Sequence, residues 1–464
     1  MEAIFEPRSV AVYGASRDER KLGHVLLRNV TTGGFGGRVV AVNPGAAEVL
    51  GLPAVPALEE PVDLALVSVP AAAAQAAVAD AARAGCRAAI VLASGFGETG
   101  EAGRAVEQRL AALAGEAGMR LVGPNCMGVV SRHGDGWLNG SYFWRLPEPT
   151  PRNPHPRVPP AERGGWSPAI SWGPRERPGG VSLVSQSGAF GGMFFAEARR
   201  RGLGVARFLS VGNCADVTES DALEWLAGDG ATAVVGLFVE AFQDGRRFVA
   251  AAERCEKPVV VLKAGKGRAG ARAAASHTGS LAGRHGAARA AFARAGVVEA
   301  DTADDFFDAL QALAALPRAG RCVAVLTISG GPAVLAADAA ERLGLRLPPP
   351  GPATVRLVRE LAPPFAAAGN PIDLTPQCPP EGFPPAIAAV FDDPAFDGVL
   401  VVNCGLDVPE FGRGVAAAAR RTGKPVAAFV LDVPAVEAEL AAAGIPVLGS
   451  PERAAAAYAA VATR

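Results

Sequence analysis

Short runs of Val, Ile, Leu and Ala recur through most of the sequence, and this rhythm restricts its fold more than any other feature. In the first 130 residues the runs occupy positions 10–14, 39–43, 64–69, 88–94 and 121–123, with alanine-rich stretches between them. Continuous apolar runs without polar alternation are typical of strands that helices cover on both faces. Residues 1–130 are therefore predicted to form a Rossmann-like α/β domain with a doubly wound parallel sheet.

Two further segments repeat the rhythm and resemble one another. Apolar runs occur at 181–185, 206–212, 233–240 and 258–263, and again at 322–329, 398–403, 425–430 and 445–448. Each segment opens with a run that leads into Ser-Gly, at Ser187 and Ser329, and each has a late Lys-Pro-Val, at Lys257 and Lys424. We therefore expect two related flavodoxin-like domains, at residues 181–316 and 317–464.

The rhythm is interrupted at residues 131–180. This segment holds ten prolines and four of the five tryptophans of the protein. Proline and glycine at this density do not support regular structure, whereas a purely disordered linker seldom carries several tryptophans. The segment is predicted to be an insertion that lies over a neighbouring surface or a partner, and a partly disordered loop is an equally good interpretation.

The overall composition argues against several classes of function. A formal net charge of -1 gives no general attraction to nucleic acid or anionic lipid, so we expect neither as a partner. The N-terminus carries two acids before the first apolar run, unlike a secretory signal, which predicts a cytoplasmic protein. The seven cysteines lack CxxC spacing and no paired metal-ligand spacing occurs, so no bound metal is predicted.

Five turns of the first domain are expected at one edge of its sheet, because parallel strands end on the same side. A glycine turn that leads into a helix is where open α/β sheets hold phosphorylated ligands. The second strand ends in Asn43-Pro44 instead of the acid that accepts from the ribose of NAD, which argues against a nicotinamide cofactor. Ordinary turn chemistry explains any single turn equally well, but five together favour a bound ligand. The other turns are Gly14-Ala15-Ser16, Ser68-Val69-Pro70, Ser94-Gly95-Phe96-Gly97 and Gly123-Pro124-Asn125-Cys126.

The second domain offers a different kind of site. Ser185-Gln186-Ser187-Gly188 joins a strand to a helix, so backbone amides, hydroxyl groups and the helix dipole converge where an anion would bind. Glu240 closes an otherwise apolar strand at the same predicted edge. Its carboxylate could accept from one nitrogen of an imidazole and leave the other nitrogen free for attack on phosphorus, and a helix-capping acid is the alternative interpretation.

His277 lies in a run of small residues, with Ser276 before it and Thr278-Gly279 after it. Such a segment has too little bulk to pack into a core, so the imidazole is predicted to be presented and able to move. Taken alone, His277 is more readily interpreted as a solvated loop histidine, because isolated histidines seldom do chemistry. The preceding Lys263-Ala-Gly-Lys266-Gly-Arg268 is not a P-loop, because Gly-x-x-x-x-Gly-Lys-Ser/Thr does not occur in the sequence.

In their order and spacing, these residues resemble those of the α-type subunit of the nucleoside-diphosphate-forming acyl-CoA synthetases. This family includes relatives of succinyl-CoA synthetase and ADP-forming acetate–CoA ligase. The resemblance covers nearly the whole sequence except residues 131–180. The matching motifs are Gly14-Ala15-Ser16, Lys21 to Gly23, Asn43-Pro44, Gly123 to Cys126, Ser185 to Gly188, Ser210 to Asn213, Ser276 to Gly279, Asn370 to Thr375 and Gly444 to Val447.

The resemblance implies an enzyme that interconverts acyl-CoA, ADP and phosphate with a carboxylic acid, CoA and ATP. His277 would be the phosphorylated histidine and Glu240 would steady it, with an acyl phosphate as the preceding intermediate. The residues implied in CoA binding are Gly14, Ala15, Ser16, Lys21, Asn43, Pro44, Val69, Pro70, Ser94, Gly95, Pro124 and Asn125. Those implied in phosphate binding are Ser185, Gln186, Ser187, Gly188, Gly212, Asn213, Ser276, Thr278 and Gly279.

The same resemblance predicts a partner. The family handles its nucleotide with an ATP-grasp module, and nothing after Asn370 resembles one. We therefore expect a separate β-type subunit that brings ATP or ADP and Mg²⁺, and so a hetero-oligomer. Two alternatives stay open from the residues: a non-catalytic CoA-binding or acyl-CoA-sensing protein, and an NAD-dependent oxidoreductase suggested by fold analogy alone.

Overall fold

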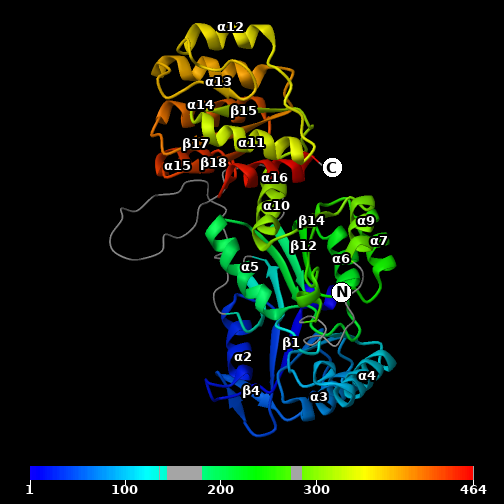
Figure 1. The fold of residues 1–464 in the computed structure, drawn as a ribbon. Helices are drawn as coiled ribbons and strands as arrows, with labels where there is room; N and C mark the ends of the chain where they lie inside the picture. The colour runs from blue at the N-terminus through cyan, green and yellow to red at the C-terminus, as the bar shows by residue number, and fades with distance from the viewer. Residues whose placement is uncertain (135, 144–179, 273–284, 463–464) are drawn as a thin grey trace. The chain divides into compact units, whose positions relative to one another are not determined.

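The computed structural model describes residues 1–134, 136–143, 180–272 and 285–462. These residues belong to two compact units, which we describe separately (Figure 1). The first unit comprises the described residues up to 143 and from 180 to Asp301, and the second begins at Thr302. Among the described helices, none combines the length and the apolar character needed to cross a bilayer.

The first unit contains two sheets. Its strands are β1 (Ser9–Tyr13), β2 (Arg38–Val42), β3 (Glu48–Val49), β4 (Leu52–Val55), β5 (Leu64–Val67), β6 (Ala88–Val91), β7 (Arg120–Val122), β8 (Gly128–His133), β9 (Gly136–Ser141), β10 (Gly180–Ser185), β11 (Val205–Ser210), β12 (Thr232–Val239), β13 (Val259–Lys263) and β14 (Val298–Ala300). Its helices are α1 (Glu2–Phe5), α2 (Leu22–Thr32), α3 (Ala71–Arg83), the short η1 (Gly97–Thr99), α4 (Glu101–Glu116), α5 (Gly188–Arg201), α6 (Glu219–Gly228), α7 (Gly245–Arg254) and α9 (His285–Arg294).

The first sheet has the strand order β3-β4-β2-β1-β5-β6-β7. All pairs are parallel except β3 with β4 at the edge. Numbered in sequence order, the parallel strands follow the order 3-2-1-4-5-6 of the dinucleotide-binding fold, with the switch point between β1 and β5. The predicted Rossmann-like domain is thus confirmed, and the carboxyl ends of its strands meet at one edge.

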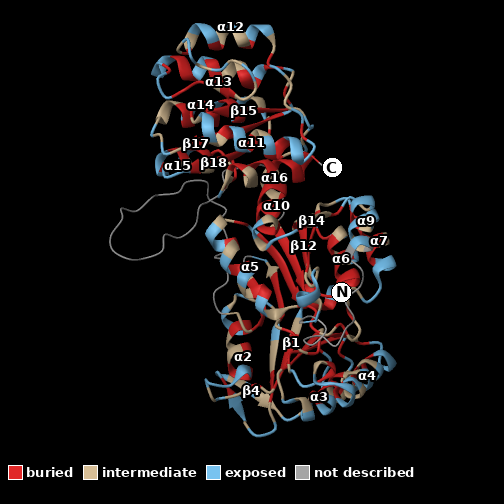
Figure 2. Cartoon of the chain, in the orientation of Figure 1, coloured by how far each residue is buried: buried red, intermediate tan, exposed pale blue. Residues whose placement is uncertain are grey.

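Helices cover both faces of this sheet, as continuous apolar strands require. Successive residues of β1 belong to two hydrophobic clusters, Val10 and Val12 to one and Ala11 and Tyr13 to the other. Figure 1 shows α2 on the first face and α3 with α4 on the second. The central strands β1, β5 and β6 are almost entirely buried, whereas β2 and β4 toward the edge are only partly buried (Figure 2). Each fully buried Val or Leu contributes about 1.5–3 kcal/mol to folding.

The second sheet has the order β14-β13-β12-β10-β11-β8-β9. The parallel strands β10 to β14 follow the flavodoxin-like order 2-1-3-4-5, as predicted for this domain. The hairpin of β8 and β9 pairs antiparallel with β11. One hydrophobic cluster runs from the first sheet into the second through Val129, Leu138 and Val184.

The β8–β9 hairpin differs from our expectation for residues 131–180. We expected no regular structure there, but residues 131–133 extend β8 and residues 136–141 form β9. The reason is burial: Leu138 is fully buried and Trp137 nearly so, and buried Arg207 donates to the Ser131 hydroxyl and the Arg132 carbonyl. The remaining tryptophans of the segment, at 144, 166 and 172, lie outside the described residues.

The second unit is built on a single parallel sheet of order β16-β15-β17-β18-β19, again 2-1-3-4-5. The second flavodoxin-like domain is therefore confirmed. Its elements are α10 (Ala303–Ala315), β15 (Val323–Thr327), α11 (Gly330–Arg342), α12 (Pro352–Leu361), β16 (Ile372–Asp373), the short η2 (Pro380–Gly382), α13 (Phe383–Asp392), β17 (Gly398–Cys404), α14 (Pro409–Thr422), β18 (Val426–Leu431), α15 (Pro434–Ala442), β19 (Val447–Leu448) and α16 (Pro451–Ala462).

Helix α10 belongs to this second unit, whereas we expected it to close the 181–316 domain. It packs against α16, where Arg453 donates from Nε and Nη2 to the buried Asp308 carboxylate at 2.6 and 2.8 Å. A charged pair at a helix interface leaves no signal in the spacing of apolar runs, so the sequence alone does not reveal this packing of α10.

Candidate functional site

The turn after β1 is fixed by two glycines. Gly14 has a φ of +80°, and a Cβ atom there would overlap the Ser68 carbonyl oxygen. A Cβ atom at Gly23 would overlap the carbonyl oxygen of Gly14 itself. The beginning of α2 therefore approaches the turn as closely as backbone can. This explains the Lys21-x-Gly23 pattern, and it places the exposed Lys21 at the N-cap of α2 beside the turn.

Asn43 braces this turn from the end of β2. Its Nδ2 donates to the Ala15 carbonyl oxygen at 2.6 Å, and its Oδ1 accepts from the Gly45 N–H at 2.7 Å. On the other side, Nδ1 of the buried His24 lies 2.8 Å from the Ser16 carbonyl oxygen. Asn43 thus shapes the first turn, whatever it contacts in a ligand.

The twelve residues predicted to bind CoA lie along this one edge but differ in exposure. Exposed positions are Lys21, Pro44, Pro70, Ser94 and Gly95; half-buried positions are Gly14, Ser16, Asn43, Val69 and Asn125; buried positions are Ala15 and Pro124. Ala15 and Pro124 are therefore covered by other residues in this structure. The neighbouring Cys126 thiol is buried against the Val91 carbonyl, and burial raises its pKa to about 12, so it is no nucleophile.

Asn213 joins the edge of the second sheet to two turns of the first. Its Nδ2 donates to Oε2 of Glu98 and Oε2 of Glu107, each at 2.7 Å, and its Oδ1 accepts from Asn125 at 3.2 Å. Burial alone would raise the pKa of Glu98, but the bonds from Asn213 and the Gly95 N–H lower it. The side chain of Asn213, predicted to bind phosphate, is thus engaged with carboxylates in this structure.

Gly212, which precedes Asn213, lies against the turn that contains Pro124 and Asn125. Its φ is +53°, and a Cβ atom there would overlap the Pro124 carbonyl oxygen, which also accepts from the Asn213 N–H. Only glycine fits this approach of the two turns.

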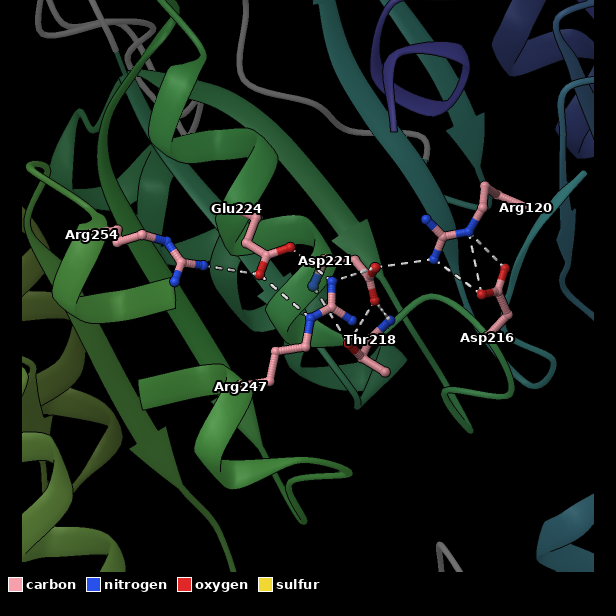
Figure 3. Close-up of polar contacts among 7 residues, drawn as sticks. All are labelled: Arg120, Asp216, Thr218, Asp221, Glu224, Arg247 and Arg254. Carbon is pink, nitrogen blue, oxygen red and sulfur yellow. Dashed lines mark hydrogen bonds and ion pairs between the residues drawn. The ribbon is translucent and has the colours of Figure 1, made fainter. Parts of the chain in front are cut away.

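A ladder of ion pairs extends the contact between the two sheets (Figure 3). Arg120 of β7 binds Asp216 through Nε at 2.9 Å and Asp221 through Nη2 at 3.1 Å. Arg247 of α7 binds the same Asp221 and Glu224, and Thr218 caps α6 through a reciprocal bond with Asp221. Burial would raise the pKa of Asp221, but these partners lower it to about 2. The start of α6 is therefore held firmly against β7.

Gln186 occupies the centre of the edge of the second sheet. Its Oε1 accepts from the N–H groups of Glu240 and Ala241 at 2.7 and 3.0 Å. Its Nε2 donates to the Ala241 carbonyl at 2.7 Å and to Oε2 of Glu219 at 3.3 Å. Gln186 thus holds the segment just after β12, where Glu240 is buried.

The rest of the predicted phosphate-binding motif surrounds Gln186. The buried Ser185 donates from its hydroxyl to the Ser187 carbonyl at 2.7 Å, and half-buried Ser187 caps α5 by accepting from the Phe190 N–H. Gly188 is the first residue of α5 and is also half-buried. The motif therefore stands at the N-terminus of a helix, where the backbone favours an anion.

Sequence reasoning missed two ionisable residues at this edge, Lys263 and Glu219. Lys263 is the last residue of β13, is 7% exposed, and donates from Nζ to the carbonyl oxygens of Glu240 and Ala264 at 2.5 and 2.6 Å. Burial lowers the pKa of its ammonium group, and the Glu240 charge opposes that shift. The signal was available, because Lys263 closes an apolar strand as Glu240 does.

Glu219 is the first residue of α6 and is 1% exposed. Burial raises the pKa of its carboxyl group to about 7, partly opposed by the bond from Gln186. Nothing in the local sequence distinguishes this glutamate from an ordinary first-turn acid, so only the structure could identify it.

His277, Ser276, Thr278 and Gly279 lie outside the described residues, so their predicted roles are not tested by the geometry. Within the described ranges, no group of three or more His, Cys, Asp or Glu side chains is arranged to hold a metal ion. Two sets of residues are thus in place: an accessible edge of glycine turns at a Rossmann switch point, and a second edge that combines a helix N-terminus with buried ionisable groups.

Three family models match successive parts of the sequence. A CoA binding domain matches residues 8–132, a succinyl-CoA ligase like flavodoxin domain matches residues 178–313, and a ligase-CoA domain matches residues 323–437. These matches follow the three sheets in order.

Similar proteins share nearly the whole length. The α subunit of ADP-forming acetate–CoA ligase II of Pyrococcus furiosus is 35% identical, and the match covers 97% of that subunit and 99% of this protein. ADP-forming acetate–CoA ligase I of Archaeoglobus fulgidus is 37% identical over 87% of this protein, which spans 54% of that ligase. The dinucleotide-forming acetyl-coenzyme A synthetase 1 of Ca. Korarchaeum cryptofilum, solved with phosphate and ADP, superposes with a TM-score of 0.85 at 32% identity, over 96% of its own length and 100% of this protein. The chain therefore belongs to the family of nucleoside-diphosphate-forming acyl-CoA synthetases, as an α-type subunit.

Proposed function

We propose that the chain catalyses the acyl and phosphoryl transfer steps of an ADP-forming acyl-CoA synthetase, with acetate as the first acid to test. Support comes from the pairing, in one compact unit, of an accessible Rossmann edge and an edge that buries Glu240 beside the N-terminus of α5. The relatives that match over the full length are named as acetate–CoA ligases, so the alternative of a non-catalytic CoA-binding protein is not favoured.

The reaction proceeds in three balanced steps. An oxygen of inorganic phosphate attacks the thioester carbonyl carbon, the C–S bond breaks, and CoA leaves as the thiolate with an acyl phosphate as product. A ring nitrogen of His277 then attacks phosphorus, the bond from phosphorus to the acyl oxygen breaks, and the carboxylate leaves. Finally a β-phosphate oxygen of ADP attacks phosphorus, the P–N bond breaks, and ATP forms.

Each group of residues contributes one physical effect to these steps. The turns that include Gly14, Ser16 and Lys21 bind the phosphorylated part of CoA. The backbone around Ser187, at the start of α5, stabilises the phosphate charge as the transition state forms. The Glu240 carboxylate accepts from the second ring nitrogen of His277, which fixes the reactive tautomer and stabilises the imidazolium that develops.

The nucleotide site is proposed to lie on an ATP-grasp module, supplied by a separate β-type subunit together with Mg²⁺. Support comes from the relatives: the P. furiosus protein that matches over 97% of its length is named as subunit alpha, and the A. fulgidus ligase, of which the match covers 54%, is longer. Mixing the chain with candidate ATP-grasp subunits and measuring a stable complex by light scattering tests this part directly.

The function is tested by incubating the chain with acetyl-CoA and ³²P-labelled inorganic phosphate, with and without the ATP-grasp partner. We expect an acid-labile, base-stable label on His277 and release of free CoA. His277→Ala should abolish labelling and leave CoA binding unchanged. Lys21→Ala should raise the concentration of CoA needed for half-saturation about tenfold and still allow labelling from ATP with the partner. An unlabelled wild-type protein under both conditions would reject the proposed function.

A further inference from the structure

The backbone at Glu240 is held from both neighbouring strands by side chains. In the second sheet, β12 lies between β10 and β13. Gln186, just after β10, accepts from the Glu240 N–H at 2.7 Å, and Lys263, at the end of β13, donates to the Glu240 carbonyl at 2.5 Å. The N–H and the carbonyl of Glu240 are therefore each hydrogen-bonded to a side chain, instead of to the backbone of a neighbouring strand.

Each of these two side chains is itself fixed. The N–H groups of Glu240 and Ala241 on the amide oxygen of Gln186, and the Ala241 carbonyl on its nitrogen, set the orientation of the amide. Glu219 provides a second acceptor for the same nitrogen. Lys263 also binds the Ala264 carbonyl, so its ammonium bridges the ends of β12 and β13.

Folding alone does not favour such an arrangement. A buried ammonium or carboxylate group costs several kcal/mol of desolvation, and a neutral residue can end a strand without that cost. Ionisable groups that are buried at a strand edge therefore indicate a functional demand more often than a structural one. The demand here is a fixed direction for the Glu240 side chain, which follows from a fixed peptide plane on either side of its Cα.

We propose that Lys263 and Glu219 are positioning residues that act on Glu240, Lys263 directly at its carbonyl and Glu219 through the Gln186 amide. This inference rests on the proposed function, because Glu240 acts there on His277. A carboxylate that is misplaced by about 1 Å accepts poorly from the imidazole and slows phosphoryl transfer roughly 10²-fold. CoA binding, which uses the edge of the first sheet, stays unchanged.

A double-mutant cycle on the rate of ³²P labelling of His277 from acetyl-CoA and labelled phosphate tests the proposal. Lys263→Met keeps the aliphatic bulk and removes the donors, and Glu240→Ala removes the group that is positioned. We expect Lys263→Met to slow labelling at least about tenfold in the wild-type background and less than about twofold in the Glu240→Ala background. Lys263→Met should leave the dissociation constant of CoA within about twofold.

Lys257 provides a matched control. It lies just before the opposite end of β13 and also donates from Nζ to two backbone carbonyls, those of Leu226 and Asp229, at 2.7 and 2.5 Å. Lys257→Met therefore removes the same kind of contact from the same strand, away from Glu240. We expect it to lower the melting temperature without slowing the labelling of His277 more than about twofold.

Substitutions of Glu219 test the contact of Gln186 with the Glu240 N–H. This test is independent of whether Lys263→Met folds. Glu219→Ala removes the acceptor for Gln186 and should slow labelling about tenfold, whereas Glu219→Gln keeps an acceptor and should stay within about threefold of the wild-type rate.

If the effects of Lys263→Met and Glu240→Ala multiply, or if Glu219→Ala labels at the wild-type rate, the positioning proposal is wrong while the proposed function stands. If the wild-type protein takes no label, both fall.

Discussion

The second and third sheets share the strand order 2-1-3-4-5, but the residues at the carboxyl ends of their central strands differ: they are ionisable in the second sheet and neutral in the third. When the two are aligned by strand pairing, Glu240 corresponds to Cys404 and Lys263 to Val430. The N–H of Cys404 is bound by the Ser329 hydroxyl at 3.0 Å, where Glu240 has the Gln186 amide. Val430 is buried in an apolar cluster.

The comparison separates what the fold needs from what the chemistry needs. In the third sheet the half-buried Cys404 and the buried Val430 end the corresponding strands, so the topology does not require a glutamate and a lysine there. The strand order therefore does not explain the ionisable pair at the second sheet, and the positioning of Glu240 is the role that we propose for it. Substitutions at corresponding positions of the second and third sheets should therefore have unequal effects on activity and stability.

The largest effect is expected when the carboxylate is removed from the second sheet. Glu240→Ala should lower the rate of His277 labelling roughly 10²- to 10³-fold, because an electrostatic partner of the reacting imidazole is lost. The aligned change Cys404→Ala should lower it less than about threefold. Both rates are measured with acetyl-CoA and labelled phosphate. Equal losses for the two variants would contradict the asymmetry between the sheets.

The next effect is on stability and comes from moving the charge. Val430→Lys places an ammonium in the apolar cluster of the third sheet and should lower the free energy of unfolding by about 3–5 kcal/mol. Denaturant titration measures this. Val430→Met, which adds similar length without charge, should cost about 1–2 kcal/mol. If Val430→Lys proved as stable as Val430→Met, the third sheet would tolerate a buried charge at this position, which would contradict the difference that we infer between the two sheets.

Much of the fold could be predicted because parallel strands leave a direct trace in sequence. The runs that end near Tyr13, Ser185 and Thr327 are apolar on both faces, and that pattern fixes strand positions and the α/β class. The β8–β9 hairpin was missed because its support, buried Leu138 and the Arg207 contacts, is long-range. The position of a polar residue that closes an apolar strand, as Glu240 does, could be predicted from the sequence, and its role stays a prediction.

Other parts of the site have no such trace. Gly14 and Gly23 could be placed at a turn, but the overlap that makes them necessary depends on how closely α2 approaches β1. Asn213 could be assigned to a motif, but its two carboxylate partners are more than a hundred residues away in sequence. Glu219 is indistinguishable from any acid in the first turn of a helix until its burial is known.

A smaller effect concerns the pH dependence of stability at the second edge. The pKa of Glu219 is raised from 4.5 to about 7, so between these values the folded protein binds more protons than the unfolded protein. Its contribution to the free energy of unfolding therefore falls as pH rises from about 4.5 to 7, by up to about 3 kcal/mol. Glu219→Gln should remove this slope. Unfolding of the wild-type protein and of Glu219→Gln, measured from pH 5 to 8, checks it.

The smallest effect is expected at Asn213, which links the second sheet to residues that follow strands of the first sheet. Asn213→Ala removes the donor that separates the Glu98 and Glu107 carboxylates, and should lower the free energy of unfolding by about 1–2 kcal/mol. Asn213→Asp adds a third negative charge at the same place and should cost more than alanine does at pH 8. The two variants are compared by denaturant titration at that pH. Because the Asn213 side chain bonds to residues of the first sheet's turns and Glu240 is held by Gln186 and Lys263, labelling of His277 should fall less than about threefold in the alanine variant. A loss as large as that of Glu240→Ala would mean that the link between the sheets, and not the side chains that hold Glu240, governs the chemistry of the second edge.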